Sequence, residues 1–453
     1  MTTANASSYA LPEPAPGPTG MPLLGNLPDF AADPLAFLTR LRDDHGDVVA
    51  WRLGGRPCLF LARPEHIAEV LAGAETVFRK TELGSAFRQV FGAGLVTSEG
   101  AEWQRRRAAV QPAVRPRHVK SYARTMIDCA EEFVSDRRSC ERVDVRREMM
   151  TLTQRIAVRT IFGIDSTGRE AAIGRAMDIA QEELGASLRG LGGRLPAWIP
   201  TPGRRRLAAA VEEIDTEVGR VVKERRRAHE ERDDLVSRLM AASDEQGRSL
   251  TDREIRDEAV TLYVGGHETT GMLLTWAWYL LSRNPEARGR LTAELDDVIG
   301  QGRAPSYDDY EQLRYTRQIV KETLRLYPPV WLTRVVAREG SVLAGRSIPE
   351  GTMLWTSQWA THRDPRWFPD PAEFRPERWN DEVATGIPEH AWYPFGGGPR
   401  ACIGARFAQV EAALVLATVA RRCHFDIDSG DIAPKAELML RPDRDVMATV
   451  RLV

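Results

Sequence analysis

A ten-residue segment near the C-terminus constrains this chain more than any other feature: Phe395-Gly-Gly-Gly-Pro-Arg-Ala-Cys402-Ile-Gly404. Its four glycines allow a tight loop whose backbone can approach a large, flat partner closely. Apolar residues at helical spacing follow at once and predict a helix over 403–420. We therefore expect Cys402 at or just before a helix N-terminus, where the helix dipole and free N–H groups favour a thiolate.

A thiolate held in this way is a suitable ligand for haem iron. A buried structural cysteine in a tight turn is the alternative interpretation. Arg400 adds a fixed positive charge two residues before the thiol, and the presence of the full string Phe-x-x-Gly-x-Arg-x-Cys-x-Gly favours the ligand interpretation.

A second motif, Gly265-Gly266-His267-Glu268-Thr269-Thr270, lies inside a helical pattern over 252–283. Two glycines in mid-helix cost roughly 1–2 kcal/mol relative to alanines, so a compensating role is expected. They let a flat ligand approach, and the Thr hydroxyl can bond back to a carbonyl and open the helix locally. An acid beside an alcohol suits proton delivery to dioxygen, whereas a harmless kink is the alternative. His267 is interpreted as a residue that packs or bonds locally.

Two further motifs pair charged or aromatic residues on one helix face. Glu322 and Arg325 are three residues apart, and Trp103 and Arg107 are four apart, so each pair shares a face. Pro328 and Pro329 end the first of these helices.

Together these motifs resemble the cytochrome P450 superfamily, and the resemblance covers nearly the whole chain. It rests on Phe395, Gly398, Arg400, Cys402 and Gly404 of the loop and on the match of residues 265–269. It implies a mainly α-helical fold: one large domain with small β-sheets enclosing haem b, with Cys402 as the axial metal ligand.

The resemblance also implies roles for other residues. Thr269 corresponds to the catalytic threonine and Glu268 to the adjacent acid, while Gly265, where Ala is commoner, leaves more room above the iron. Glu322, Arg325 and Arg378 correspond to a buried structural network. Trp103, Arg107, Arg334 and Arg400 are candidates for the haem propionates, and His362 and His390 are given structural roles first. The expected substrate pocket is lined by Phe87, Phe91, Gly265, Val330, Trp331, Leu332, Leu438 and Met439.

The implied activity is insertion of one oxygen atom from O2 into a hydrophobic small molecule, of terpenoid, polyketide or fatty acyl type, in bacterial secondary metabolism. No flavin or iron–sulfur module is visible, so NAD(P)H is expected to act through an external ferredoxin and reductase. A basic cluster, Arg105, Arg106, Arg115 and Arg117, can dock an acidic donor. Alternatives are a haem-thiolate enzyme that rearranges peroxides and a non-catalytic haem sensor; the acid–alcohol pair and the absence of a regulatory module speak against them.

Composition limits the remaining possibilities. With 453 residues and no internal linker, we expect a flexible Pro-rich segment over 1–20 and one domain over 21–453. The net charge of −2 argues against nucleic acid as a partner. Five scattered cysteines fit a reducing compartment. Because the first residues show no signal peptide or membrane anchor, we expect a cytoplasmic protein, and a monomer.

A coarse pattern of elements accompanies the motifs. Residues 48–53 and 58–61, around Gly54-Gly55, predict a β-hairpin, and a second small sheet is expected around 335–357. The stretches 82–100 and 189–203 are interpreted as loops over the pocket. Long helices are predicted over 119–140, 146–162, 169–190, 204–230, 252–283 and 403–420.

Overall fold

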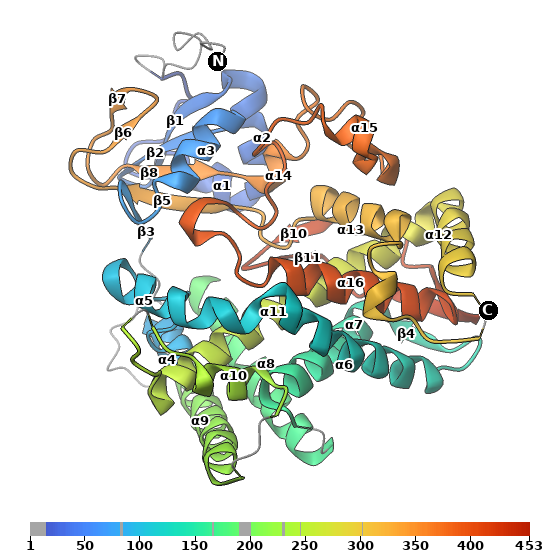
Figure 1. Cartoon of the computed structure of the whole chain (residues 1–453). Coiled ribbons are helices and arrows are strands. Elements are labelled where there is room, and N and C mark those ends of the chain that lie inside the picture. The colour runs from blue at the N-terminus through green and yellow to red at the C-terminus, as the bar shows by residue number, and fades with distance from the viewer. Residues whose placement is uncertain are drawn as a thin grey trace. The chain divides into compact units, whose positions relative to one another are not determined.

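The computed structural model in Figure 1 describes residues 15–81, 85–164, 167–189, 201–228, 232–244, 246–300 and 302–453. The chain divides into two compact units, each assembled from separate segments. The first, here called the sheet unit, comprises Met1–Thr81, Lys321–Cys402 and Ala433–Asp443. The second, the helical unit, comprises Glu82–Val320, Ile403–Ile432 and Arg444–Val453. Residues 1–14 of the predicted Pro-rich segment lie outside the described residues.

A five-stranded sheet with the order β1-β2-β8-β5-β3 organises the sheet unit. Its strands are β1 (Val48–Leu53), β2 (Arg56–Leu61), β3 (Phe78–Lys80), β5 (Thr333–Ala337) and β8 (Met353–Thr356). The predicted hairpin is confirmed, because β1 and β2 pair antiparallel and turn at Gly54, whose φ is +63°. The second predicted sheet segment joins the same sheet, since β8 pairs in parallel with β2.

Aromatic side chains form the core on one face of this sheet. The ring centroids of Trp51 and Trp355 are 4.9 Å apart, and those of Trp51 and Phe37 are 5.2 Å apart. Phe37 belongs to a helix that begins where Asp33 accepts the Ala36 N–H. The unit also contains α1 (Leu27–Ala32), α2 (Pro34–His45), α3 (Pro64–Ala72), α14 (Gln358–Thr361), α15 (Asp381–Ala384) and the ribbons β6 (Val342–Leu343)–β7 (Arg346–Ser347) and β10 (Pro434–Ala436)–β11 (Leu440–Pro442).

The longest helix of the helical unit, α11, covers Asp252–Arg283 as the sequence predicts. It begins at a reciprocal capping box in which Thr251 and Glu254 satisfy each other's backbone N–H groups. The other helices are α4 (Ser85–Phe91), α5 (Gly100–Val110), α6 (Pro116–Ser135), α7 (Val145–Ala157), α8 (Thr167–Arg189), α9 (Pro202–Ala228), α10 (Leu235–Ala241), α12 (Pro285–Val298) and α16 (Ala405–Ala420). Helix α13 (Arg314–Leu326) contributes to both units.

Several sequence predictions differ from the structure. The helix predicted over 119–140 ends at Ser135, and the one predicted to reach 162 finishes in a π-helical turn (Val158–Phe162). The stretch 82–100 is not only a loop, because it contains α4. Residues 190–200 of the other predicted loop lie outside the described residues.

A small sheet of the helical unit escaped sequence analysis. It has the order β4-β12-β9 and joins β4 (Arg142–Asp144), β9 (Cys423–Ile427) and β12 (Met447–Leu452). The strands are short and far apart in the chain, so local periodicity does not reveal their pairing. Phe425 of β9 packs edge-on against Trp278 of α11, with ring centroids 5.0 Å apart, and this contact fixes the sheet on the helix.

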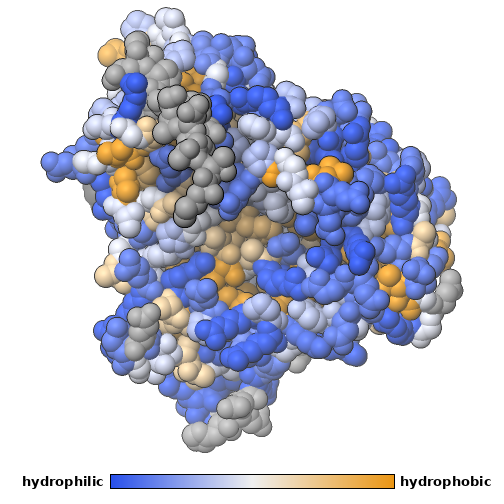
Figure 2. All heavy atoms as spheres, turned by 45° about the horizontal axis from the view of Figure 1, so that its top comes forward, coloured by the Kyte–Doolittle hydropathy of each residue, from blue (hydrophilic) through white to orange (hydrophobic). Residues whose placement is uncertain are grey.

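The surface is mostly polar on the face drawn in Figure 2, with apolar residues in scattered patches. Among the described residues, no helix has both the length and the apolar character required to cross a lipid bilayer.

Buried charges tie the end of α13 to the segment that follows residue 370. Glu322 is fully buried and pairs with Arg325 at 2.7 Å and with Arg378 at 3.4 Å. The same carboxylate accepts the Trp379 indole N–H at 3.0 Å and the Arg375 backbone N–H at 3.0 Å. The structure thus brings together the three residues of the predicted network.

Replacing Glu322 with Gln should lower the free energy of unfolding by about 3–5 kcal/mol, because Arg325 and Arg378 would lose their buried counter-charge. Urea unfolding followed by circular dichroism measures this. Asp128→Asn is the matched control, because its pair with Arg124 is exposed (44% and 84%) and exposed ion pairs contribute little to stability. Equal losses in the two variants would contradict the interpretation.

Candidate functional site

Cys402 lies in a glycine loop of the sheet unit and is exposed. Gly396 and Gly398 have φ angles of +68° and +61°, which other residues adopt only with strain. The Cys402 backbone N–H donates to the Phe395 carbonyl at 2.8 Å and closes the loop. Helix α16 begins at Ala405, three residues after the thiol. The sequence predicts a start at residue 403, two residues earlier.

The glycine loop lies directly against the end of α3. A Cβ atom added to Gly398 would be 2.2 Å from the Leu71 carbonyl oxygen, and one added to Gly397 would be 3.0 Å from the Leu71 side chain. Any larger residue at Gly398 would therefore push the loop away from α3. Because Gly397 and Gly398 have no side chains, the backbone that carries Cys402 can pack directly against α3.

The other cysteines have different environments. Burial raises the pKa of Cys58 to about 11 and the pKa values of Cys129 and Cys423 to about 12, so these thiols stay protonated. Cys140 is exposed but belongs to a turn that precedes β4. Cys402 alone combines exposure with the glycine loop.

The Gly265–Thr269 motif lies in the middle of α11. The Thr269 hydroxyl donates to the Gly265 carbonyl at 2.6 Å, as predicted, but the helix continues without a break. Gly265 is exposed, and apart from the adjoining residues and nearby backbone of α11, no described heavy atom lies within 4 Å of a Cβ built on it or on Gly266. This face of α11 therefore admits a flat group. Glu268 and Thr269 are half-buried on the following turn.

His267 points to the other side of α11 and is 1% exposed. Its Nε2 donates to the Met150 carbonyl at 3.1 Å, and burial lowers its pKa to about 4. This local bonding agrees with the structural role that the sequence predicts.

Sequence analysis missed one acid near this motif. Glu411 of α16 is 1% exposed, and burial raises the pKa of its carboxyl well above the usual range, opposed by the Thr270 hydroxyl. Burial therefore favours the protonated form of this carboxyl, which lies beside Thr270, the residue that follows Thr269. The available signal was a single acid in the stretch Val410–Ala420 of α16, which is otherwise apolar except for Thr418.

The propionate candidates fall in both units. On α5 of the helical unit, Trp103 is buried and Arg107 is half-buried. In the sheet unit Arg334 is exposed, with its guanidinium 5.6 Å from the Trp355 ring centre. Arg400 forms an ion pair with Glu75, a residue in a left-handed conformation (φ +103°) that sequence reasoning did not single out.

Both histidines that were given structural roles lie in the sheet unit. His362 is fully buried and accepts the Tyr393 N–H at 2.9 Å, and burial lowers its pKa well below the usual value. His390 lies beside the glycine loop, since a Cβ added to Gly397 would be 3.1 Å from its Nε2.

The predicted docking cluster is wrong for Arg106. This side chain is 4% exposed, and its guanidinium contacts Glu258 at 3.2 Å, so it cannot meet a partner protein. Arg105 is also engaged, in an ion pair with Glu254. Arg115 and Arg117, at the start of α6, are exposed.

The predicted pocket residues form two groups, one in each unit. In the sheet unit the Trp331 indole N–H donates to the Glu437 carbonyl at 2.9 Å, and the Leu440 N–H donates to the Pro329 carbonyl at 2.9 Å. These bonds bring the segment of Val330, Trp331 and Leu332 next to the turn that carries Leu438 and Met439. In the helical unit the rings of Phe87 and Phe91 stack at 6.0 Å on α4, and Gly265 lies on α11.

Known proteins resemble this chain over almost its whole length. A cyclooctatin synthase of Streptomyces melanosporofaciens is 36% identical over 93% of the chain and 92% of its own length. A cyclooctat-9-en-7-ol 5-monooxygenase of the same organism is 36% identical over 89% and 88%. A pentalenene oxygenase of Streptomyces avermitilis is 32% identical over 92% and 93%. The model of the family described as cytochrome P450 matches residues 15–449, and the chain therefore belongs to the cytochrome P450 family.

Proposed function

We propose that this cytochrome P450 monooxygenase inserts one oxygen atom into a cyclic terpenoid, with Cys402 as the thiolate ligand of its haem. The family implies haem held by a cysteine thiolate. The observation that supports Cys402 as the ligand is its exposure in a glycine loop. This loop cannot accommodate a larger residue at Gly398 without moving. Terpenoid-modifying relatives of 32–36% identity support the substrate class over the polyketide and fatty acyl alternatives.

The residues present fit a bound haem. A thiol is exposed in the sheet unit, and the Gly265–Gly266 face of α11 admits a flat group. Trp103, Arg107 and Arg334 offer an indole N–H and guanidinium groups for the two haem carboxylates. Arg400 would take part alongside its partner Glu75. When bound, the haem supplies activation of dioxygen and transfer of one oxygen atom.

The protein's own groups orient the substrate and manage protons. In the sheet unit, Val330 is exposed and Leu332, Leu438 and Met439 are half-buried, so these apolar side chains can reach a substrate, whereas Trp331 is buried behind them. Phe87 and Phe91 are buried on α4 of the helical unit. Thr269 Oγ1 holds its proton toward the Gly265 carbonyl (2.6 Å), next to the half-buried Glu268. Glu411, beside Thr270, is a further group that can hold a proton, because burial raises the pKa of its carboxyl.

The electron donor in this proposal is an acidic ferredoxin, with NAD(P)H acting through its reductase. The exposed cations Arg115 and Arg117 support a docking site for this ferredoxin. The buried Arg106 is not part of it. We also propose that the enzyme is cytoplasmic and monomeric and acts in bacterial secondary metabolism.

Turnover under ¹⁸O2 tests the function. The haem-loaded enzyme is combined with ferredoxin, reductase, NADPH and pentalenene, and products are analysed by mass spectrometry. We expect an NADPH-dependent product that carries one ¹⁸O atom. A product formed only from an added hydroperoxide, without NADPH, would favour the peroxide-rearranging alternative, and no product from any terpenoid hydrocarbon or alcohol would remove the proposed substrate class.

Thr269→Ala should uncouple the enzyme without unfolding it, because the hydroxyl is needed only during turnover. We expect more hydrogen peroxide per NADPH consumed, and roughly a tenfold lower product yield, since general acid–base groups contribute at least about that much. Thr275→Ala is the matched control, as the Thr275 hydroxyl makes the same bond four residues back, to Gly271 at 2.7 Å, but is fully buried. Unchanged coupling in Thr269→Ala would exclude the residue from proton management.

Reversal of the exposed charges at Arg115 and Arg117 to Glu should slow reduction by ferredoxin. Steering by exposed charges is screened beyond about 10 Å at 0.1 M salt, so the wild-type rate should also fall as salt rises. Stopped-flow reduction under carbon monoxide measures both effects. Arg205→Glu, an exposed cation on α9, serves as the control. A rate indifferent to salt and to both reversals would place the donor site elsewhere.

A further inference from the structure

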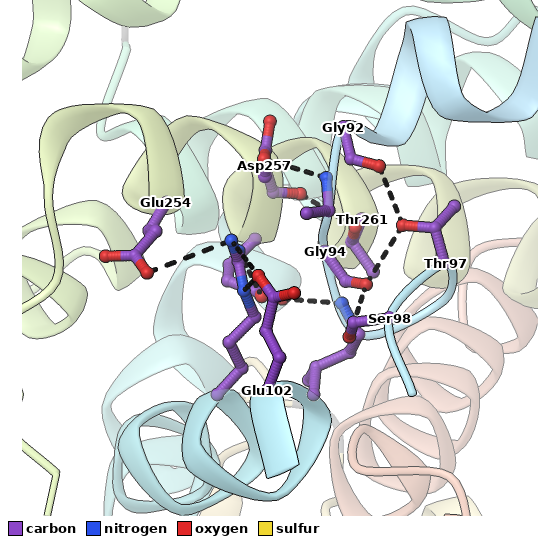
Figure 3. A network of polar contacts seen from close by, with 12 residues as sticks. Gly92, Gly94, Thr97, Ser98, Glu102, Glu254, Asp257 and Thr261 are labelled. Atoms are coloured by element: carbon purple, nitrogen blue, oxygen red, sulfur yellow. Dashed lines mark hydrogen bonds and ion pairs between the residues drawn. The ribbon is translucent and has the colours of Figure 1, made fainter. Parts of the chain in front are cut away.

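Three consecutive residues near the beginning of α11 contact the end of α4 and the segment that leads from it to α5. Arg256 Nη1 donates to the Val90 carbonyl in the last turn of α4 at 2.6 Å. Asp257 accepts the Ala93 backbone N–H at 2.9 Å, and Glu258 accepts the Leu95 backbone N–H at 3.1 Å. Two adjacent carboxylates of α11 thus hold two alternate amides of one segment, residues 92–98 (Figure 3).

The backbone of residues 92–98 is fitted closely to α11. Gly92 has a φ of +54°, and a Cβ atom on it would lie 2.1 Å from Asp257 Oδ1. A Cβ atom on Gly94 would lie 2.3 Å from the Thr261 hydroxyl oxygen. The hydroxyls of Thr97 and Ser98 close the segment on itself by donating to the Gly94 carbonyl at 3.1 and 2.9 Å (Figure 3). The contact therefore depends on glycine at both positions.

Both carboxylates are almost inaccessible to water. The exposed fraction is 3% for the Asp257 side chain and 0% for Glu258. A buried carboxylate is unfavourable unless it is paired or hydrogen-bonded. Glu258 meets this requirement with the Leu95 N–H and with Arg106 of α5, whose Nη1 lies 3.2 Å from Oε1. The acid consequently joins α5, α11 and residues 92–98 at one point.

We propose that Asp257 and Glu258 are positioning residues that hold residues 92–98 on α11 and thereby set the place of Phe87 and Phe91. Glu258 is eleven residues before Thr269, which puts both on nearly the same face of α11, about 16 Å apart. One helix then carries both the proton-managing threonine and the anchor of the segment after α4. The consequence for substrate rests on the proposed function, in which Phe87 and Phe91 line the pocket.

Burial gives this anchor a dependence on pH. It raises the pKa of Glu258 from its usual 4.5 to about 7, whereas release of the segment would expose the carboxyl and return its pKa toward 4.5. Protonation of Glu258 therefore favours the state in which residues 92–98 are bound to α11. The stability of this bound state falls as pH rises from 4.5 to 7 and then stays constant. The charged groups that act directly on Glu258 are Arg106 and Asp257. Arg106 also pairs with Glu102 and Glu254, and Asp257 pairs with Arg256. Glu254 pairs in turn with Arg105.

Amide hydrogen exchange of the haem-loaded enzyme tests the proposal. Asp257→Ala and Glu258→Ala should each speed exchange in residues 92–98 about tenfold or more, because a buried N–H loses its hydrogen-bond acceptor. Asp257→Asn and Glu258→Gln keep an acceptor oxygen and should restore most of the protection. After correction for intrinsic exchange, opening in the wild type should increase from pH 5 to pH 7, and Glu258→Gln should abolish this trend.

Glu102→Ala is the control, since Glu102 also pairs with Arg106 but is 53% exposed and accepts no amide of the segment. Exchange unchanged in both alanine variants, or equally fast in Glu102→Ala, would overturn the proposal. The bulky iron ligand 4-phenylimidazole should bind faster in the alanine variants, as followed by the Soret shift. If 4-phenylimidazole bound the alanine variants at the wild-type rate although their amides exchanged faster, Asp257 and Glu258 would have no role in placing Phe87 and Phe91.

The spectrum of the reduced carbon monoxide complex is recorded first. A wild type without the thiolate spectrum would refute the proposed function. A normal spectrum with unchanged exchange would refute only the anchoring role.

Discussion

The close contact between Gly398 and the Leu71 carbonyl is the constraint on which the account of the site depends. A thiol that binds iron must be accessible, yet its backbone must not move. Gly398 meets both requirements because it has no side chain: an added Cβ atom would lie only 2.2 Å from that carbonyl oxygen. Its φ of +61° is also one that glycine adopts without strain. The loop is fixed from behind by α3, and the closing bond from Cys402 N–H to Phe395 O leaves Sγ exposed.

In each unit, a buried acid also holds separate elements in place. In the sheet unit Glu322 joins α13 to the segment of Arg378 and Trp379, so the chain that leads to the glycine loop is held by an ion pair inside the core. In the helical unit Glu258 joins α5 and residues 92–98 to α11. Each acid is fully buried and has at least two donors, as charged groups in a protein interior require. Loss of one partner is therefore expected to act on several elements at once.

Local signals predicted much of this structure, and distant pairing accounts for most of what they missed. The apolar periodicity over 252–283 predicted the bounds of α11, and the Gly54-Gly55 pair predicted the first hairpin, because these signals lie in neighbouring residues. Arg106 looked like a free surface cation, since nothing nearby in sequence shows that Glu258, 152 positions later, buries it. Glu75 and Glu411 were missed for the same reason: their environments come from Arg400 and from α11, far away in the chain.

The central claim is that Cys402 supplies the thiolate ligand, and the most direct test is the spectrum of the reduced carbon monoxide complex. The wild type should show the long-wavelength Soret band of a haem thiolate, and Cys402→Ser should lose it. Cys140→Ser, which removes the other exposed thiol, should keep it. If Cys402→Ser bound haem and retained the long-wavelength band, another residue would be the ligand and the account of the glycine loop would be wrong.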